Sequence, residues 1–368
     1  MKHNIEVIAN NFGIYGTYIS SKLFGNGHIN TTYIVSYNEL GKITRYILRK
    51  INKFVFKEPK IVIANSVNIS THVKNKLVNR GVIDVSRRTM TFIKTHSGEY
   101  YHIDENKNYW SMVLFFEDAY TIDFVKTKEQ SYKLGKAFGN FQKLISNANI
   151  SDYKETIPDF HNLPKRLLAF DAAVKTNPSN RLKNIQDELI AINNNRGISH
   201  KYTELISKNL PLRITHNDTK INNVMLDHKT DEGLCIIDLD TIMPGTVLND
   251  FGDMVRTSTA TVAEDEKDLS KVNIQVDFFD ALTKGYMEAL VGIITNIEID
   301  NLVYGAKLII YEQAIRFLTD YLLGDIYYST AYVNHNLIRA KNQLALLNSV
   351  LLHEDKMESI IKKYTQIL

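Results

Sequence analysis

One β-prone stretch, residues 211–241, lies within a region that otherwise has the pattern of long helices. Its apolar runs LRIT, NVMLD and LCIID are short, and Asn, Asp, Lys and Gly separate them. Asn, Asp and Gly are typical of tight turns, and Asn and Lys are poor strand formers. The stretch therefore predicts short strands joined by tight turns, set as a small β insert among helices.

The first 118 residues have a different bias, toward strands with one inserted helix. Apolar spacing at 59–81 predicts a helix that ends at a glycine. Runs rich in β-branched and aromatic residues predict strands on both sides of a Gly-rich turn within 18–37, and again at 45–51, 88–95 and 110–118. Together they predict a small, mostly antiparallel sheet accompanied by one helix.

The remainder is mainly helical. Apolar residues recur at helical spacing in 127–146, 179–195, 275–294, 301–324 and 334–355, with Ser179 as a plausible cap for the second helix. We therefore predict an α+β fold of two lobes. A β-rich lobe would span 1–118 and a larger helical lobe 119–368, with the boundary in FEDAYT.

Composition narrows the class of partner. The 44 basic and 41 acidic residues give a net charge of only +3, without the clustered basic excess expected of a nucleic-acid-binding protein. The single cysteine, Cys235, cannot form a disulfide within the chain, and we interpret it as a small buried hydrophobe. There is no signal-peptide pattern and no run of about 20 apolar residues that could cross a membrane. We expect a cytoplasmic protein without a membrane or nucleic-acid partner.

The segment HNDTKINN (216–223) holds the densest group of candidate functional side chains. Asp218 follows a short apolar run, with Lys220 two and Asn223 five positions later, and a predicted hairpin then ends at Asp238. Because a hairpin returns the chain to its start, Asp238 can face Asn223. An amide and a carboxylate oxygen suit Mg²⁺ when a nucleotide supplies other oxygens. Asp218 is then free to accept a proton from a hydroxyl, and Lys220 to neutralise charge on a phosphoryl group.

Three neighbouring polar residues receive other interpretations. His216 is expected to be structural and to pack beneath the loop. Asp240 has two open roles, contact with metal or substrate and formation of a turn. The literal DFG at 250–252 follows no apolar strand, so we interpret Asp250 as a structural residue near a helix start that bonds backbone amides under the loop.

A nucleotide site is predicted in the strand-rich region. Gly25 and Gly27 lie at a strand turn, where small residues let backbone N–H groups approach phosphates. The following cationic strand, YILRKI, offers Arg49 and Lys50, and strand alternation allows only one of them to face the cleft. We prefer Lys50, which shares a face with Tyr46 and Leu48.

These motifs resemble the aminoglycoside phosphotransferase and choline kinase superfamily, which has a bilobal protein-kinase-like fold. Within it, the chain is similar to the bacterial N-acetylhexosamine 1-kinases over roughly residues 15–350. The segments that carry this similarity are GNGHINTTYIV, YILRKIN, FEDAYTIDFV, GKAFGNFQ, FHNLPKRL, HNDTKINNVMLD, IDLDTIMPG, DFGDMVRT and RFLTDYLLGDIYY. Those kinases phosphorylate the anomeric hydroxyl of GlcNAc or GalNAc with ATP and Mg²⁺.

The resemblance implies roles for particular residues. It implies Asp218 as the base and Asn223 and Asp238 as metal ligands, and it adds His28, Arg316 and Tyr327 as sugar contacts. Two of these have ordinary structural alternatives: Arg316 could cap a helix or pair with Asp320, and Tyr327 could be a core residue. A neutral sugar suits bidentate donors and an aromatic platform better than the acidic cluster that a polycationic aminoglycoside requires.

One departure from the kinase pattern affects the nucleotide site. The helix at 59–81 lacks the Glu that pairs with the strand cation in many kinases, and Ala64 and Asn65 stand where that Glu is expected. Either another acid substitutes for it, or the cation is held by the phosphates alone. The choice of Lys50 depends on this point more than the assignment of the base does.

The leading hypothesis is an ATP- and Mg²⁺-dependent kinase that phosphorylates the 1-hydroxyl of an N-acetylhexosamine. A second hypothesis keeps the fold and changes the acceptor to another sugar, an amino alcohol or a small antibiotic. A third is a pseudokinase that binds a ligand and regulates a partner. The sequence leaves open GlcNAc or GalNAc, ATP or GTP, and a monomer or a homodimer.

Overall fold

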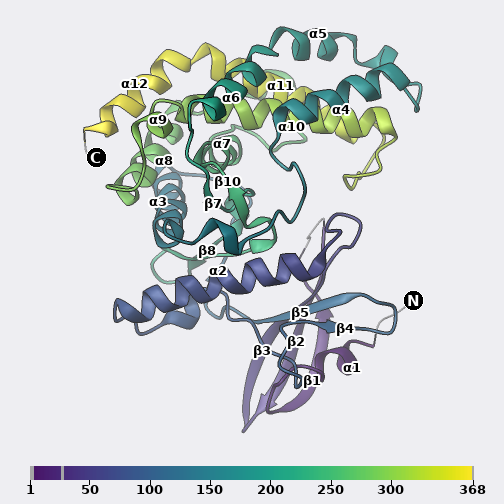
Figure 1. Ribbon diagram of the computed structural model, residues 1–368, viewed down its shortest axis with the longest axis vertical. Coiled ribbons are helices and arrows are strands. Elements are labelled where there is room, and N and C mark those ends of the chain that lie inside the picture. Colours follow the sequence, from purple (N-terminus) through teal and green to yellow (C-terminus); the bar gives the residue numbers. More distant parts are fainter. Residues whose placement is uncertain (1–3, 26–28, 367–368) are drawn as a thin grey trace.

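The protein has two lobes, seen in a computed structural model that describes residues 4–25 and 29–366. One lobe is built around a five-stranded sheet, and the larger lobe is a stack of helices (Figure 1). Helix α2 (Pro59–Asn79) runs between them. The α+β fold with an antiparallel sheet in the first lobe and a helical second lobe confirms the prediction. The division at residue 118 stays a prediction.

The sheet is antiparallel throughout, in the order β1-β2-β3-β5-β4. Its strands are β1 Thr17–Leu23, β2 Thr31–Glu39, β3 Lys42–Lys50, β4 His102–Ile103 and β5 Tyr109–Leu114. Alternate residues of β3 give its two faces different surroundings. Tyr46 and Leu48 pack with Trp110 and with helix α1 (Ile5–Ala9), whereas Ile47 packs against the core of the larger lobe.

Two predictions from the sequence are wrong, one in the smaller lobe and one in the larger lobe. Residues 88–95 form no regular strand: they make isolated bridges, such as Phe92 with Val113, because Thr95 bonds Glu99 and turns the chain away. The helix expected from Ser179 begins only at Gln186. The Ser179 hydroxyl caps no helix and instead donates to the Leu322 carbonyl at 2.7 Å.

The larger lobe is organised around the buried helix α10. Its ten helices within the described residues are α3 Lys128–Ile145, α4 Leu163–Thr176, α5 Gln186–Asn194, α6 Gly197–Ser207, α7 Val247–Ser258, α8 Val276–Ala289, α9 Asn296–Ile299, α10 Leu302–Leu323, α11 His335–Leu352 and α12 Glu354–Thr365. Helix α7 crosses α10 where Gly252 meets Gly305. A Cβ on Gly252 would lie 2.1 Å from the Gly305 carbonyl oxygen, so only glycine permits this close approach.

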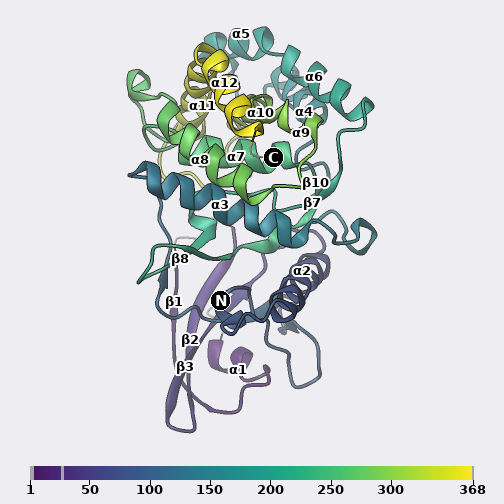
Figure 2. The same ribbon diagram turned by 90° about the vertical axis from the view of Figure 1, so that its left-hand side faces the viewer.

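Short strands at the base of this lobe carry the motif segment. Strands β7 (Arg213–Thr215) and β10 (Met243–Gly245) pair, and β6 (Ala119–Tyr120), β8 (Val224–Asp227) and β9 (Gly233–Ile236) form a three-stranded sheet. The β-prone stretch thus forms the predicted short strands. They lie next to the five-stranded lobe, with α2 alongside (Figure 2). No helix among the described residues is long and apolar enough to span a membrane.

Candidate active site

The loop between β7 and β8 brings three candidate side chains together. The Asp218 carboxylate accepts from Lys220 Nζ at 2.9 Å. The Asn223 side-chain amide donates to the Asp218 carbonyl at 2.8 Å and reaches its carboxylate at 3.3 Å. Burial opposes ionisation of Asp218, but Lys220, by its charge and its hydrogen bond, brings the pKa of this carboxyl below its ordinary value. Asp218 is therefore ionised at neutral pH.

Two buried side chains support the loop from beneath. The carboxylate of Asp250, in the first turn of α7, accepts from the backbone N–H groups of His216 and Asn217 at 2.9 and 2.7 Å. This confirms the interpretation of Asp250 as a structural residue. His216 is fully buried, packs against Phe138 and lies 2.9 Å from the Ile237 carbonyl oxygen, as expected for a side chain beneath the loop.

Hydrogen bonds hold both the backbone N–H and the side chain of Asn217, the residue before Asp218. It has a left-handed backbone with φ 62°, and its side-chain amide donates to the carbonyls of Thr215 and Thr241 at 3.1 and 3.0 Å. Its side-chain oxygen lies so close to Gly245 that a Cβ there would be 2.5 Å away. Gly245 is thus required for the loop conformation. The sequence analysis missed this residue, whose only signal is a glycine that follows MP in a β-prone run.

Asp238 reaches the same point from β9. The Ile237 N–H donates to the Asn223 carbonyl at 2.9 Å, which places Asp238 beside the loop. Its backbone is left-handed, with φ 57°. Burial and the negative charges of Asp240 and Asp218 raise the pKa of Asp238 to about 6, although Arg49 opposes this rise. The carboxylates of Asp218, Asp238 and Asp240 therefore lie close together; Lys220 pairs with Asp218, and Arg49 lies near the other two.

The choice between the two basic residues of β3 is corrected. Arg49, not Lys50, reaches this cluster: its guanidinium lies 2.9 Å from the Asp240 carboxylate and 3.6 Å from that of Asp238. The error has a physical reason, because Tyr46 and Leu48 face the core of the smaller lobe, so the cleft face is that of Ile47 and Arg49. The sequence preference for Lys50 rested on the opposite assignment of the two faces.

Asp240 also accounts for the missing glutamate of α2. It is 3% exposed on its side chain and pairs with Arg49 across the lobes, so another acid does substitute. The α2 residue at the expected position, Asn65, donates instead to the carbonyls of Lys154 and Ile242 at 2.7 and 2.8 Å. It ties α2 to the segment that follows Asp240.

The predicted phosphate turn is described only in part. Gly25 follows β1 and has φ +75°, a conformation that favours glycine, and among the described residues other than its chain neighbours no atom lies within 4 Å of the Cβ it lacks. Gly27 and His28 lie outside the described residues. The roles of all three stay predictions.

Arg316 and Tyr327 lie together near the loop end of α10. The Arg316 guanidinium stacks over Phe160 at 4.8 Å and lies 6.0 Å from the ring centre of Tyr327. Neither structural alternative is observed. Asp320 accepts from the backbone N–H groups of 326–328 rather than from Arg316, and Tyr327 is 36% exposed. Their part in acceptor binding stays a prediction.

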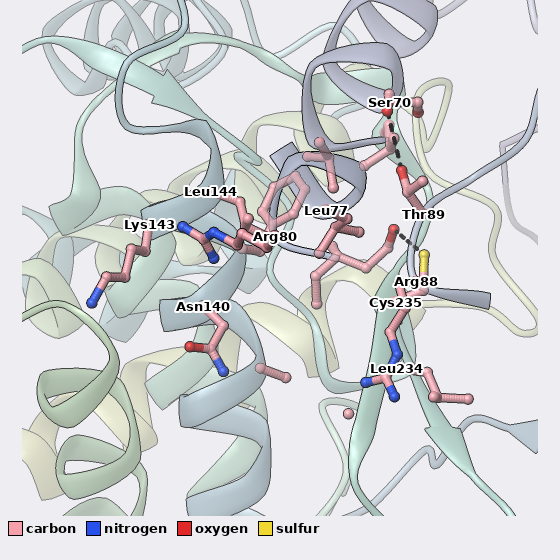
Figure 3. A pocket seen from close by; sticks show the side chains of 16 residues that line it. Ser70, Leu77, Arg80, Arg88, Thr89, Asn140, Lys143, Leu144, Leu234 and Cys235 are labelled. Carbon is pink, nitrogen blue, oxygen red and sulfur yellow. Dashed lines mark hydrogen bonds between the residues drawn. The ribbon is translucent and has the colours of Figure 1, made fainter. Parts of the chain in front are cut away.

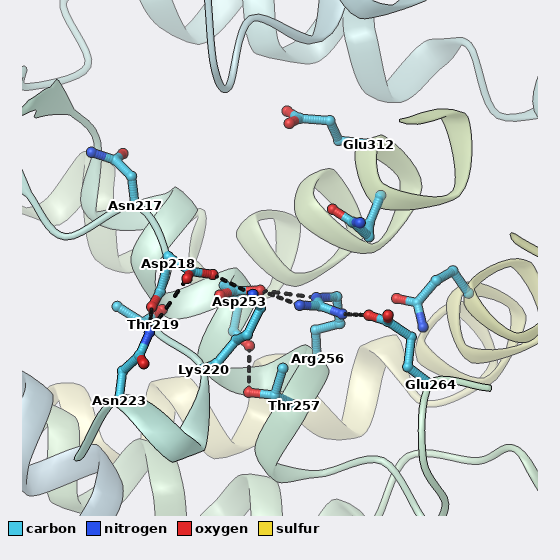
Figure 4. A network of polar contacts seen from close by, with 12 residues as sticks. Asn217, Asp218, Thr219, Lys220, Asn223, Asp253, Arg256, Thr257, Glu264 and Glu312 are labelled. Carbon is cyan, nitrogen blue, oxygen red and sulfur yellow. Dashed lines mark hydrogen bonds and ion pairs between the residues drawn. The ribbon is translucent and has the colours of Figure 1, made fainter. Parts of the chain in front are cut away.

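A polar network missed by the sequence analysis extends behind Asp218 (Figure 4). The Arg256 guanidinium, on α7, pairs with Asp253 at 2.8 Å and with Glu264. Asp253 in turn adds to the negative field that raises the pKa of Lys220. Lys220 thus contacts Asp218 directly and feels the negative charge of Asp253, while Arg256 opposes that effect.

The donor set at this point suits a hard cation that a nucleotide helps to bind. No group of three or more His, Cys, Asp or Glu side chains in the described part of the chain forms a complete metal site. Asn223 and Asp238 nevertheless offer oxygen atoms, since the Asn223 amide nitrogen is engaged by Asp218 and leaves its oxygen as a ligand. Mg²⁺ is commonly bound by one or two protein oxygens together with substrate phosphates. The residues therefore fit such an ion.

A cavity of about 210 Å³ lies elsewhere, among α2, α3 and the β8–β9 hairpin (Figure 3). Its wall is largely apolar, with Leu77, Phe141 and Leu234, and it includes the buried thiol of Cys235. None of Asp218, Asn223 and Asp238 lines it. Burial raises the pKa of Cys235 far above its ordinary value, as expected for an unreactive buried thiol.

Solved structures share this fold along nearly their whole length. An aminopropanol kinase associated with a microcompartment has a TM-score of 0.58 at 12% identity, covering 96% of this chain and 98% of its own. A spectinomycin phosphotransferase, solved with ADP and spectinomycin, has a TM-score of 0.58 at 13% identity, covering 95% and 97%. An ethanolamine kinase from Plasmodium vivax has a TM-score of 0.52 at 12% identity, covering 92% and 84%.

A family model provides the closer assignment. The model described as "Phosphotransferase enzyme family", APH, matches residues 20–272, well over half of the chain. That range begins within β1 and runs past the loop of Asp218 to the segment after α7, so it includes Arg49 and the Asp218 loop but not Arg316 or Tyr327. The chain belongs to the APH phosphotransferase family.

Proposed function

We propose that this phosphotransferase moves the γ-phosphoryl group of ATP to the anomeric 1-hydroxyl of an N-acetylhexosamine. One observation carries the phosphotransfer part of the proposal. Asp218, Asn223 and Asp238 come together beside a cation from the other lobe, Arg49. This is the set of groups that phosphoryl transfer needs: a base, oxygen ligands for a metal, and positive charge for the phosphates.

Asp218 takes the acceptor proton. Its carboxylate is ionised, and Lys220 holds one oxygen at 2.9 Å while Asn223 lies against the other. As the acceptor oxygen bonds to the γ-phosphorus, the bond from that phosphorus to the ADP oxygen breaks, and the hydroxyl proton passes to Asp218. Lys220, beside the same carboxylate, offsets the negative charge of the phosphoryl group.

Asn223 and Asp238 would hold Mg²⁺, which when bound neutralises charge on the β- and γ-phosphates. The raised pKa of Asp238 reflects an excess of negative charge that a divalent cation would relieve. Arg49, on the cleft face of β3, supplies a further cation on the nucleotide side.

The choice of a sugar acceptor rests on the resemblance of separated segments to N-acetylhexosamine 1-kinases and on the charge of the acceptor wall. Arg316 and Arg166 interact electrostatically with each other and with Glu312, and Arg316 lies 6.0 and 5.6 Å from the ring centres of Tyr327 and Tyr328, so two guanidinium groups, one carboxylate and two phenols share this region. Such a wall disfavours a polycationic aminoglycoside and suits a neutral ligand with several hydroxyls. Another small hydroxyl acceptor is the second candidate, because the fold is shared with kinases of amino alcohols.

An ADP-release assay with a panel of acceptors tests the proposal. GlcNAc and GalNAc should give turnover, and glucose, choline and kanamycin little or none. EDTA should abolish the activity and added Mg²⁺ restore it. Turnover on choline or kanamycin without turnover on either hexosamine would overturn the sugar assignment and leave the phosphotransferase. Repeating the panel with GTP separates the two nucleotides.

A further inference from the structure

His161 connects the acceptor side of the site to the loop of Asp218. It lies at the start of α4, and its Nδ1 is 3.0 Å from a carboxylate oxygen of Glu312 on α10. Its Nε2 is 3.0 Å from the backbone carbonyl of Asn217. This carbonyl belongs to the peptide bond that leads directly into Asp218. The two contacts span 151 and 56 positions of the sequence, so the fold alone brings them together.

The partners define the protonation of the ring. A backbone carbonyl oxygen only accepts, so Nε2 must carry a hydrogen. An ionised carboxylate also only accepts, so Nδ1 must carry one as well, and the ring is then an imidazolium. Glu312 is ionised: burial opposes this, but His161, Arg316 and Arg166 together lower the pKa of its carboxyl.

The charged groups around His161 come from three helices. Glu312 and Arg316 face it from α10, Arg166 lies close to Glu312 from α4, and Asp250 acts on it from α7. Burial disfavours the charged ring and Arg316 repels it, but Glu312 and the hydrogen bonds outweigh both and raise the pKa of His161. The side chain is only 10% exposed, so solvent screens these interactions little.

The Asn217 carbonyl is the one group of that residue which the loop itself does not hold. Its N–H donates to Asp250, and its side-chain amide donates to the carbonyls of Thr215 in β7 and of Thr241 in the turn after Asp238. The peptide between Asn217 and Asp218 is contacted at both polar atoms: its N–H donates to His216 Nδ1 at 3.3 Å, and its carbonyl lies against His161. The contact with His161 adds to the restraint on rotation of this peptide. Any such rotation would move the Asp218 carboxylate.

We propose that His161 is a positioning residue, which in its doubly protonated form clamps the Asn217 carbonyl against Glu312 and so orients Asp218. The inference rests on the proposed role of Asp218. Glu312 serves as the counter-ion of the clamp and needs no contact with the acceptor. Loss of the His161 proton frees the clamp, because a neutral ring can no longer donate to both partners.

The first test compares His161→Gln with His161→Phe on whichever acceptor the wild type turns over. Gln keeps one N–H donor for Asn217 but has no charge, and Phe has neither. We expect kcat to fall ~10-fold in the first and up to ~100-fold in the second, the scale of a misplaced catalytic group. The KM for ATP should stay within about twofold, because His161 contacts Glu312 and Asn217 and none of the residues proposed to bind the nucleotide. Lys165→Ala, an exposed neighbour on α4, is the matched control.

The pH profile separates a charged clamp from ordinary packing. In the wild type, kcat should decline on the alkaline side as His161 loses its proton. His161→Gln should lack that decline. Glu312→Gln should move it to lower pH, because the carboxylate that stabilises the imidazolium is gone. An unchanged alkaline limb in both variants would overturn the proposal.

A measurement without turnover distinguishes failure of this proposal from failure of the proposed function. Histidine NMR of the full chain, with His161→Gln used for assignment, reports the charge of the ring directly. We expect a protonated His161 at pH 7 that titrates above the ordinary range, and a lower pKa in Glu312→Gln. A neutral His161 at pH 7 would reject the clamp whatever the acceptor is, whereas a charged ring with no turnover on any acceptor would reject only the function.

Discussion

The two sides of the cleft are held in different ways. On the side of Asp218, Asp250 accepts hydrogen bonds from two backbone N–H groups, and the side-chain amides of Asn223 and Asn217 donate to backbone carbonyls, which fixes the loop. On the acceptor side, Arg316 lies among aromatic rings and donates a hydrogen bond to Gln313 at 3.2 Å. Hydrogen bonds fix direction, whereas stacking on rings tolerates small displacements.

This difference matches the two tasks. Chemistry at the phosphoryl group requires atoms placed within a fraction of an ångström, so its side is over-determined. Recognition of an acceptor tolerates adjustment, and a wall built by stacking can be altered by few substitutions. We therefore expect changes on the first side to affect rate, and changes on the second to affect which acceptor is bound.

The largest effect should come from the base. Asp218→Asn keeps the size of the side chain and removes its ability to take a proton, so kcat should fall ~10²–10⁴-fold. Thermal unfolding should change little, because Lys220 and Asn223 still have a polar partner. Near-normal turnover by this variant would mean that Asp218 does not take the proton of the acceptor.

Among these variants, loss of the ion pair between Arg49 and Asp240 should reduce the free energy of unfolding the most. Arg49→Met leaves the carboxylate of Asp240 buried without its cation, so the free energy of unfolding should fall by about 3 kcal/mol. Arg49→Met combined with Asp240→Leu should recover most of this loss. Urea denaturation measures both, and Lys50→Met, on the next residue of the same strand, should cost less. An equal loss in the Lys50 variant would reverse the assignment of the two faces of β3.

A pH dependence follows from Asp238. Its pKa is raised to about 6, so below this pH the carboxyl is protonated and a metal must displace the proton. The apparent affinity for Mg²⁺ should therefore fall as pH drops, ~10-fold between pH 7 and pH 5 as one proton competes. Mg²⁺ titrations of the ATP-dependent activity at these two pH values test it. Asp240→Asn should weaken the dependence, since a neighbouring negative charge is lost.

The smallest effect should come from Arg316, in the region proposed to bind the acceptor. Arg316→Lys keeps the charge but loses the planar group that stacks on Phe160, so the KM for the acceptor should rise ~10-fold. kcat and the KM for ATP should stay within about twofold. Initial rates with each substrate varied in turn separate these parameters. A large fall in kcat with unchanged acceptor KM would erase the distinction between the two sides.

The sequence predicted contacts between residues close in the chain far better than contacts between distant segments. Asp218, Lys220 and Asn223 lie within six positions, and a hairpin leads on to Asp238, so local spacing encodes their meeting. Arg49 and Asp240 are 191 positions apart, and His161 and Glu312 are 151 apart. No local pattern encodes these pairs, because each depends on how the lobes and helices pack. The strand expected at 88–95 failed for the related reason that the Thr95 turn overrides a suitable composition.

The pairing of Arg49 with Asp240 has a consequence for how a nucleotide leaves the cleft. The guanidinium pairs with the Asp240 carboxylate within the protein, so phosphates that bind Arg49 would gain only the difference between two attractions. A triphosphate with its cation can compete for that guanidinium more strongly than a diphosphate can. In the proposed role of Arg49, the Asp240 carboxylate would compete with the phosphates for the guanidinium, weaken retention of the product and favour rapid exchange of the spent nucleotide.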